Sequence, residues 1–194
     1  SLYYGFTHEI SKEEFERRIQ DNTLTDVLNA VPVHKGDCFF IPSGTLHAIG
    51  AGILLAEIQQ NSNTTYRIYD YGRVGKDGKP RELHVEKAKE VTNLVPPKYP
   101  TTAQGAPTAI EGGKETLLRS CEYFNVNKLE LDGTTKLTAG EGSFNSLLVL
   151  DGAFEIAAGS EKAAAKKGDS LFITAGTGEY TVTGKGTIIL TDII

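Results

Sequence analysis

Apolar residues along most of the chain occur in short runs separated by Gly, Pro and Asn. Such runs indicate the strands of a small antiparallel barrel or sandwich. Between residues 36 and 70 the predicted strands cover 38–41, 46–49, 53–59 and 66–70. They carry an imidazole, a carboxylate and a guanidinium (His47, Glu57 and Arg67) among hydrophobic neighbours. Because burying such groups is costly unless they pair or hold a ligand, we expect this stretch to form the active wall of a barrel.

Two segments have helical patterns instead. Ser11 is followed three residues later by a glutamate, which is the capping box that opens many helices, and Phe15 lies on the apolar face of the predicted helix. With a second short helix, this helical insert spans about residues 9–30. Apolar residues at near-helical spacing predict a further helix over residues 83–94.

A proline-rich stretch without periodicity divides the chain. It predicts a connector over residues 97–116, between an N-terminal domain of residues 1–96 and a C-terminal domain of residues 117–194. The C-terminal domain is predicted to consist only of strands and turns. Asp151-Gly152 lies between two apolar runs, which is a strong hairpin signal.

Composition and charge restrict the classes of partner. The net charge is −5 and no basic run is present, so bulk electrostatics do not favour a nucleic acid or an anionic membrane. No apolar run reaches the length of a membrane span and no signal peptide is recognisable, which predicts a cytoplasmic protein. Cys38 and Cys121 are predicted to be reduced core thiols. The lack of methionine and the start in a strand-like run predict that the chain is part of a longer one.

Residues 35–47 and 167–179 repeat one pattern. Lys, Gly, Asp, Phe, Ile, Gly and Thr recur at a constant offset, which predicts a duplicated β-barrel unit. His47 of the first copy corresponds to Glu179 of the second. We interpret the shared residues as scaffold, the unshared ones as candidates for chemistry, and the second barrel as structural.

The element KGDCFFIPSGTLH resembles the second conserved motif of the cupin superfamily, in which the histidine is a metal ligand. The run PSGTLHAIGAGILLAEIQQNSNTTYRIYDYGR closely resembles the type I mannose-6-phosphate isomerases, in particular their short bacterial branch. The resemblance implies a mainly β fold of two tandem cupin-like (jelly-roll) barrels, the first incomplete and carrying the small helical insert. It also implies a zinc enzyme that interconverts mannose 6-phosphate and fructose 6-phosphate through an enediol.

The same resemblance implies a role for individual residues. His47 matches a zinc ligand, and zinc supplies a Lewis acid for the carbonyl oxygen. Arg67 matches the active-site arginine, and Glu57 matches a carboxylate close to the sugar. Such a carboxylate or a zinc-bound water could act as the base. Arg73 and Lys76, on the glycine-rich loop that follows, are candidates for binding the hexose phosphate substrate.

One feature of the family is missing from the sequence. Its other zinc ligands come from an upstream segment that nothing here matches, so we expect the chain to represent the C-terminal part of an isomerase. A zinc site needs three or four ligands, and His47 alone provides one.

Structural alternatives stay open for each candidate. His47 could be an ordinary core or surface histidine, Glu57 and Arg67 could face solvent, and Asp70 could pair with Arg67 or only pack. A second hypothesis is therefore a metal-free cupin-like module that binds or senses a sugar. The oligomeric state is left open.

Overall fold

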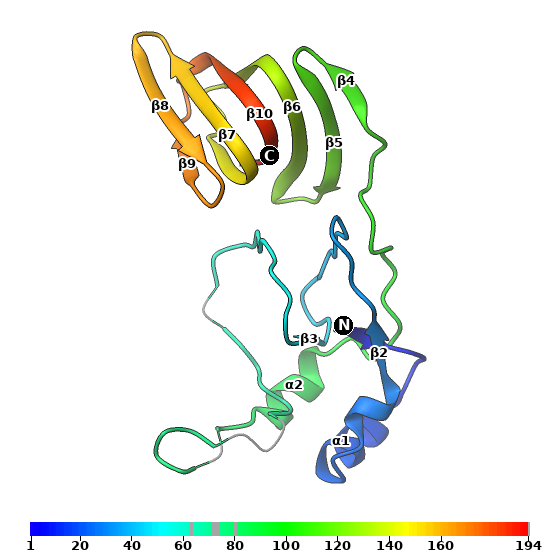
Figure 1. Cartoon of the computed structure of the whole chain (residues 1–194). Coiled ribbons are helices and arrows are strands. Elements are labelled where there is room, and N and C mark those ends of the chain that lie inside the picture. The colour runs from blue at the N-terminus through cyan, green and yellow to red at the C-terminus, as the bar shows by residue number, and fades with distance from the viewer. Residues whose placement is uncertain (63, 71–73, 80, 194) are drawn as a thin grey trace. The chain divides into compact units, whose positions relative to one another are not determined.

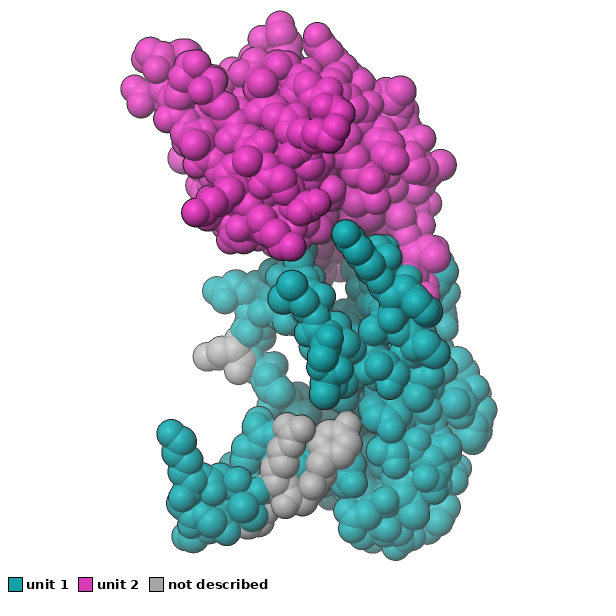
Figure 2. All heavy atoms as spheres, in the orientation of Figure 1, with its two compact units in different colours: residues 1–100 teal, residues 101–194 magenta. Residues whose placement is uncertain are grey.

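A computed structural model describes residues 1–62, 64–70, 74–79 and 81–193. The described residues are mainly β with two α-helices, which confirms the predicted fold class (Figure 1). The chain divides into two compact units, Ser1–Pro100 and Thr101–Ile194 (Figure 2). The predicted connector extends to residue 116. Strand β4 (Thr108–Ile110) lies within its C-terminal part, and strand β5 (Gly113–Ser120) begins there.

Unit 1 contains a three-stranded antiparallel sheet in the order β2-β1-β3. Its strands are β1 (Leu2–Phe6), β2 (Leu28–Val31) and β3 (His47–Ile49). Strand β3 confirms the prediction for residues 46–49. The strands predicted at 38–41, 53–59 and 66–70 are wrong, because none of the described residues of these runs takes part in a strand. A strand needs a neighbouring strand to accept its backbone hydrogen bonds, and an apolar run cannot supply that neighbour by itself.

The first helix of unit 1 follows from its capping residue. Helix α1 (Lys12–Gln20) begins where predicted, and the Glu14 backbone N–H donates to Ser11 Oγ at 3.1 Å. Phe15 on this helix is fully buried and packs edge-on against Phe6 of β1, with ring centroids 6.1 Å apart. The second predicted helix is a single 3-10 turn, η1 (Leu24–Val27), because β2 begins directly after it.

Helix α2 (Val85–Val91) lies inside the segment predicted as helical and is shorter than that segment. Lys89 on α2 donates from Nζ to Glu16 Oε2 on α1 at 2.6 Å, which ties the two helices of unit 1 together. Neither helix in the described part of the chain is long and apolar enough to cross a membrane.

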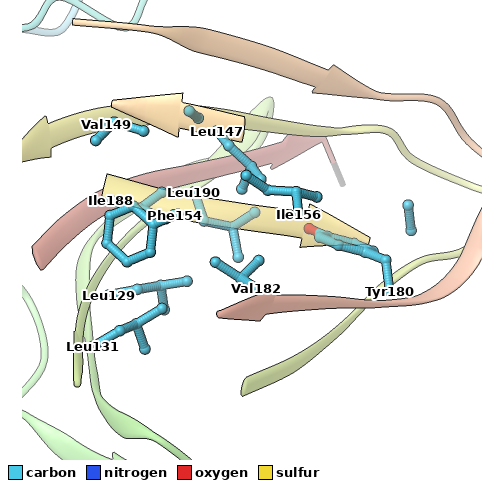
Figure 3. Packing of buried hydrophobic residues seen from close by; sticks show 12 residues of the cluster. Leu129, Leu131, Leu147, Val149, Phe154, Ile156, Tyr180, Val182, Ile188 and Leu190 are labelled. Atoms are coloured by element: carbon cyan, nitrogen blue, oxygen red, sulfur yellow. The ribbon is translucent and has the colours of Figure 1, made fainter. Parts of the chain in front are cut away.

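Unit 2 is a seven-stranded antiparallel sheet in the order β4-β5-β6-β10-β7-β8, with β9 paired to β7. Its remaining strands are β6 (Phe124–Ala139), β7 (Asn145–Ala158), β8 (Glu161–Lys166), β9 (Ser170–Ile173) and β10 (Gly178–Ile193). The core consists of aliphatic and aromatic side chains contributed mainly by β6, β7 and β10 (Figure 3). Leu129, Val149 and Ile188 in this core are each at most 1% exposed. The burial of these side chains is the main stabilising term of the unit.

The hairpin predicted at Asp151-Gly152 is wrong. Strand β7 continues through both residues and stays paired with β10, and the register shifts by one residue at this point, as in a β-bulge. Gly152 has a φ of +83° and lies against the backbone of Lys185, so only glycine fits. The Asp-Gly signal therefore predicted the positive φ of Gly152 correctly, but the chain does not reverse its direction there.

A hydrogen-bonded polar pair, Asn145 and Tyr180, is buried in unit 2. Asn145 Nδ2 donates to Thr138 O at 3.0 Å and to Tyr180 Oη at 2.8 Å. Burial raises the pKa of Tyr180 to about 12, so this phenol is neutral at physiological pH. Because the buried amide and phenol are both hydrogen-bonded, the pair connects β7 to β10 without leaving an unsatisfied group.

Candidate functional site

The two copies of the sequence repeat form the same first turn. In unit 1, Asp37 Oδ2 accepts from the His34 backbone N–H at 2.8 Å, and in unit 2, Asp169 Oδ2 accepts from the Lys166 backbone N–H at 2.9 Å. The glycine before each aspartate has a positive φ, +99° and +91° respectively. The shared Gly-Asp pair is thus turn chemistry in both units, as the repeat predicts.

The second turn of the repeat is duplicated as well. The Thr45 N–H donates to Pro42 O at 3.1 Å, and the Thr177 N–H donates to Thr174 O at 3.3 Å. After this turn both copies enter a strand, since His47 starts β3 and its counterpart Glu179 is the second residue of β10. The copies differ in the side chain at this position. The histidine is therefore presented on a scaffold whose geometry the second unit reproduces.

His47 is exposed on β3, opposite Tyr4 of β1. Its Nδ1 lies 3.0 Å from Thr45 O. Since a carbonyl oxygen can only accept, Nδ1 carries the proton and the Nε2 lone pair of the neutral ring is available to a ligand. A backbone carbonyl on the second ring nitrogen is the usual partner of a metal-binding histidine.

The described residues do not complete a metal site around His47. Within the ranges that the structure describes, no group of three or more His, Cys, Asp or Glu side chains could hold a metal ion. Zinc is normally held by three or four protein ligands. These residues by themselves therefore do not fit a zinc centre, and His47 is one candidate ligand.

Arg67 is half-buried and is held to a histidine by its main chain. The Arg67 N–H donates to His84 Nδ1 at 3.1 Å, and the His84 N–H donates to Arg67 O at 2.7 Å. The guanidinium Nη1 donates a long hydrogen bond to Glu82 O at 3.4 Å. Most of the N–H donors of this guanidinium are therefore available to other partners.

Asp70 is nearly buried and pairs with Arg81, not with Arg67. Arg81 Nε donates to Asp70 Oδ2 at 2.6 Å, and its Nη2 contacts Asp70 Oδ1. The hydrogen bond to this carboxylate raises the pKa of Arg81. The bidentate geometry is characteristic of strong Arg–carboxylate pairs. The Asp70 carboxylate therefore links residue 70 to residue 81 and is engaged in an ion pair.

The other candidates lie on irregular segments. Glu57 is exposed within residues 53–59, and Lys76 is exposed on a turn in which the Gly75 N–H donates to Lys79 O at 2.7 Å. Arg73 lies outside the described residues. Among the residues that are described, no hydrogen bond or ion pair joins His47, Glu57 and Arg67 to one another.

Comparison with known proteins identifies relatives for the whole chain. Residues 113–193 match the family model described as "Mannose-6-phosphate isomerase, cupin domain". The chain is 38% identical over 192 residues to mannose-6-phosphate isomerase ManA of Bacillus subtilis, covering 99% of this chain. The chain is a relative of the mannose-6-phosphate isomerases. This finding confirms the resemblance that the motifs around His47 and Arg67 predict.

Further mannose-6-phosphate isomerases extend the comparison. That of Streptococcus mutans is 38% identical over 89% of this chain. The crystal structure of the mannose 6-phosphate isomerase from Bacillus subtilis superposes with a TM-score of 0.87 at 32% identity, covering 98% of this chain and 59% of that one. The chain spans 60% and 53% of the length of the two curated isomerases.

Two contacts near the isomerase motif were missed by sequence reasoning, the one from His84 to Arg67 and the one from Arg81 to Asp70. A signal for them existed. Three residues forward from Arg67 leads to Asp70, and three residues back from His84 leads to Arg81, which is the relation of two antiparallel segments joined by a loop. The opposite charges of Asp70 and Arg81 then indicate a pair.

Proposed function

We propose that the protein to which this chain belongs is a mannose-6-phosphate isomerase that interconverts mannose 6-phosphate and fructose 6-phosphate through an enediol. The observation that carries the proposal is the 38% identity to a curated isomerase over 99% of this chain, which includes every candidate site residue. We also propose a cytoplasmic location, because a charged sugar phosphate does not cross a membrane unaided.

The reaction defines what the site residues must do. A proton leaves C2 of the aldose and is delivered to C1, while the hydroxyl proton on O2 is lost and O1 gains one, so that no atom is exchanged overall. Negative charge develops on the sugar oxygens in the enediolate. We assign Arg67 to that charge, because its guanidinium is permanently protonated and its fork suits two oxygens.

The remaining roles are assigned by chemical type. Glu57 is the candidate base for the proton between C2 and C1, since its carboxylate is exposed and not committed to an ion pair among the described residues. Lys76 and, outside the described residues, Arg73 are the candidate cations for the phosphate. His47 is proposed as one zinc ligand of the enzyme, with the Nε2 lone pair as its donor atom.

The zinc content of the chain is the first prediction. When expressed and purified alone, the chain is expected to hold clearly less than one zinc ion per molecule, because the described residues supply a single candidate ligand. Elemental analysis of the protein purified without chelators measures this content. One tightly held ion per chain, lost in His47→Ala and kept in the control His8→Ala, would contradict the prediction and reveal further ligands.

The proposed activity is tested by conversion of mannose 6-phosphate to fructose 6-phosphate. We expect conversion by the natural protein supplied with zinc, and none with unphosphorylated mannose at the same concentration. Binding of mannose 6-phosphate without conversion by a folded, zinc-supplied protein would overturn the proposal and favour a sugar-binding module.

A further inference from the structure

The backbone of Arg67 is fixed by a single residue. Both main-chain polar groups of Arg67 bond to His84, the N–H through the imidazole Nδ1 at 3.1 Å and the carbonyl through the His84 N–H at 2.7 Å. In a regular antiparallel pair, two facing residues exchange two backbone hydrogen bonds. Here an imidazole nitrogen replaces one of the two carbonyl acceptors.

With this replacement, residues 66–70 are paired with a neighbouring segment at Arg67 without forming a strand. A second connection between the same two segments lies three residues after Arg67, where Asp70 binds the Arg81 guanidinium in a bidentate pair. Ile68 and Tyr69 between the two connections are half-buried and pack against the hydrophobic cluster of unit 1. Side chains therefore hold the register of this segment where a sheet would normally do so.

Arg67 is the residue whose orientation depends on these connections. Its own side chain makes one long hydrogen bond, to Glu82 O at 3.4 Å, so the direction of the guanidinium is set mainly by the backbone from which it projects. A shift of about 1 Å in a catalytic group can lower a rate by about two orders of magnitude. Fixing both peptide groups of Arg67 removes such a shift.

We propose that His84 is a positioning residue of the isomerase, which orients Arg67 toward the reacting sugar by accepting its backbone N–H at Nδ1. The inference rests on the proposed function, since it assumes that Arg67 contacts the substrate. His84 itself touches no reacting atom. The bond requires a lone pair on Nδ1, so the ring proton is on Nε2. The imidazole also lies near the Tyr66 ring, with centroids 6.1 Å apart and an angle of 50° between the ring planes.

Two substitutions at one position separate positioning from general stability. His84→Ala removes the acceptor, whereas His84→Asn places an amide Oδ1 near the former Nδ1 position and keeps it. We expect kcat for mannose 6-phosphate to fall about tenfold in His84→Ala with little change in KM, and to return to within about threefold of the original in His84→Asn. His8→Ala, which removes an exposed histidine of the same unit, is expected to leave both constants unchanged.

A measurement independent of activity accompanies the kinetics. Hydrogen exchange of the peptide that contains Arg67 is expected to speed up in His84→Ala and to stay slow in His84→Asn, because only the alanine variant exposes the Arg67 amide. Equal kcat in all variants, equal losses in His84→Ala and His84→Asn, or unchanged exchange in His84→Ala would each overturn the proposal. If the original protein does not isomerise the sugar, the proposed function fails, and the exchange result alone decides whether His84 fixes the Arg67 backbone.

Discussion

Replacement of Arg67 by alanine is expected to lower kcat for mannose 6-phosphate by about 100-fold or more while KM changes by less than about threefold. In the proposed mechanism the guanidinium faces charge that exists in the enediolate and not in the bound sugar, so its loss should affect the transition state much more than the ground state. The half-buried backbone of Arg67 is held by two hydrogen bonds to His84, so the substitution removes the fork without releasing the segment. Steady-state kinetics in both reaction directions measure the effect.

The controls distinguish the charge of Arg67 from its shape. Arg67→Lys keeps a cation and loses the planar fork, and is expected to recover only part of kcat. Arg17→Ala removes an exposed arginine of helix α1 that pairs with Asp21 at 3.7 Å, and is expected to leave the kinetics unchanged. An unaltered kcat in Arg67→Ala would remove the guanidinium from the transition state, and a change confined to KM would assign it to substrate binding.

Two kinds of local sequence signal, a helix cap and a Gly-Asp turn, predicted the local structure correctly. Ser11 caps helix α1 as expected, because a cap depends only on residues within one turn. The Gly-Asp turns at Asp37 and Asp169 recur in both units for the same reason. The mainly β character, the tandem repeat and the isomerase motif around His47 were likewise legible in the sequence.

The predictions that failed depend on residues distant in the sequence. The apolar run 53–59 was interpreted as a strand, but Leu54 in it is 94% exposed, and none of its described residues pairs with a strand. The carboxylate of Asp70 was predicted to pair with Arg67 or only to pack, and in the structure it forms an ion pair with Arg81. In both cases the deciding partner lies beyond the window from which a periodicity or a turn can be read.

The metal and phosphate roles each rest on one or two residues. A single histidine with an available Nε2 lone pair satisfies the chemistry of one ligand, and the described residues add no group of three or more candidate ligands. Arg73 lies outside the described residues, and Lys76 is exposed on its turn. These assignments follow from the similarity to the isomerases, whereas the two hydrogen bonds that hold the Arg67 backbone to His84 are a feature of this chain's own structure.

Gly152→Ala is expected to destabilise unit 2 by about 2–5 kcal/mol, of which about 1–2 kcal/mol comes from the left-handed backbone and about 1–3 kcal/mol from overpacking. At the bulge of β7, an added Cβ would lie against Lys185 O and 2.8 Å from Gly186 Cα on β10. Both neighbours are backbone atoms of a paired strand, so they cannot move aside without breaking the ladder. Denaturation in guanidinium, followed by hydrogen exchange of β7 and β10, measures the loss in the full chain.

Gly168→Ala is the matched control, because Gly168 has a similar φ of +91° and no atom lies within 4 Å of its added Cβ. It is expected to cost only the conformational part, about 1–2 kcal/mol. Gly152→Asn tests the same point differently, since asparagine tolerates a left-handed backbone in an open hairpin turn but not the crowding of the bulge. Equal losses for Gly152→Ala and Gly168→Ala, with Gly152→Asn tolerated, would mean that the chain turns at Asp151-Gly152 after all, and that β7 is two strands of a hairpin.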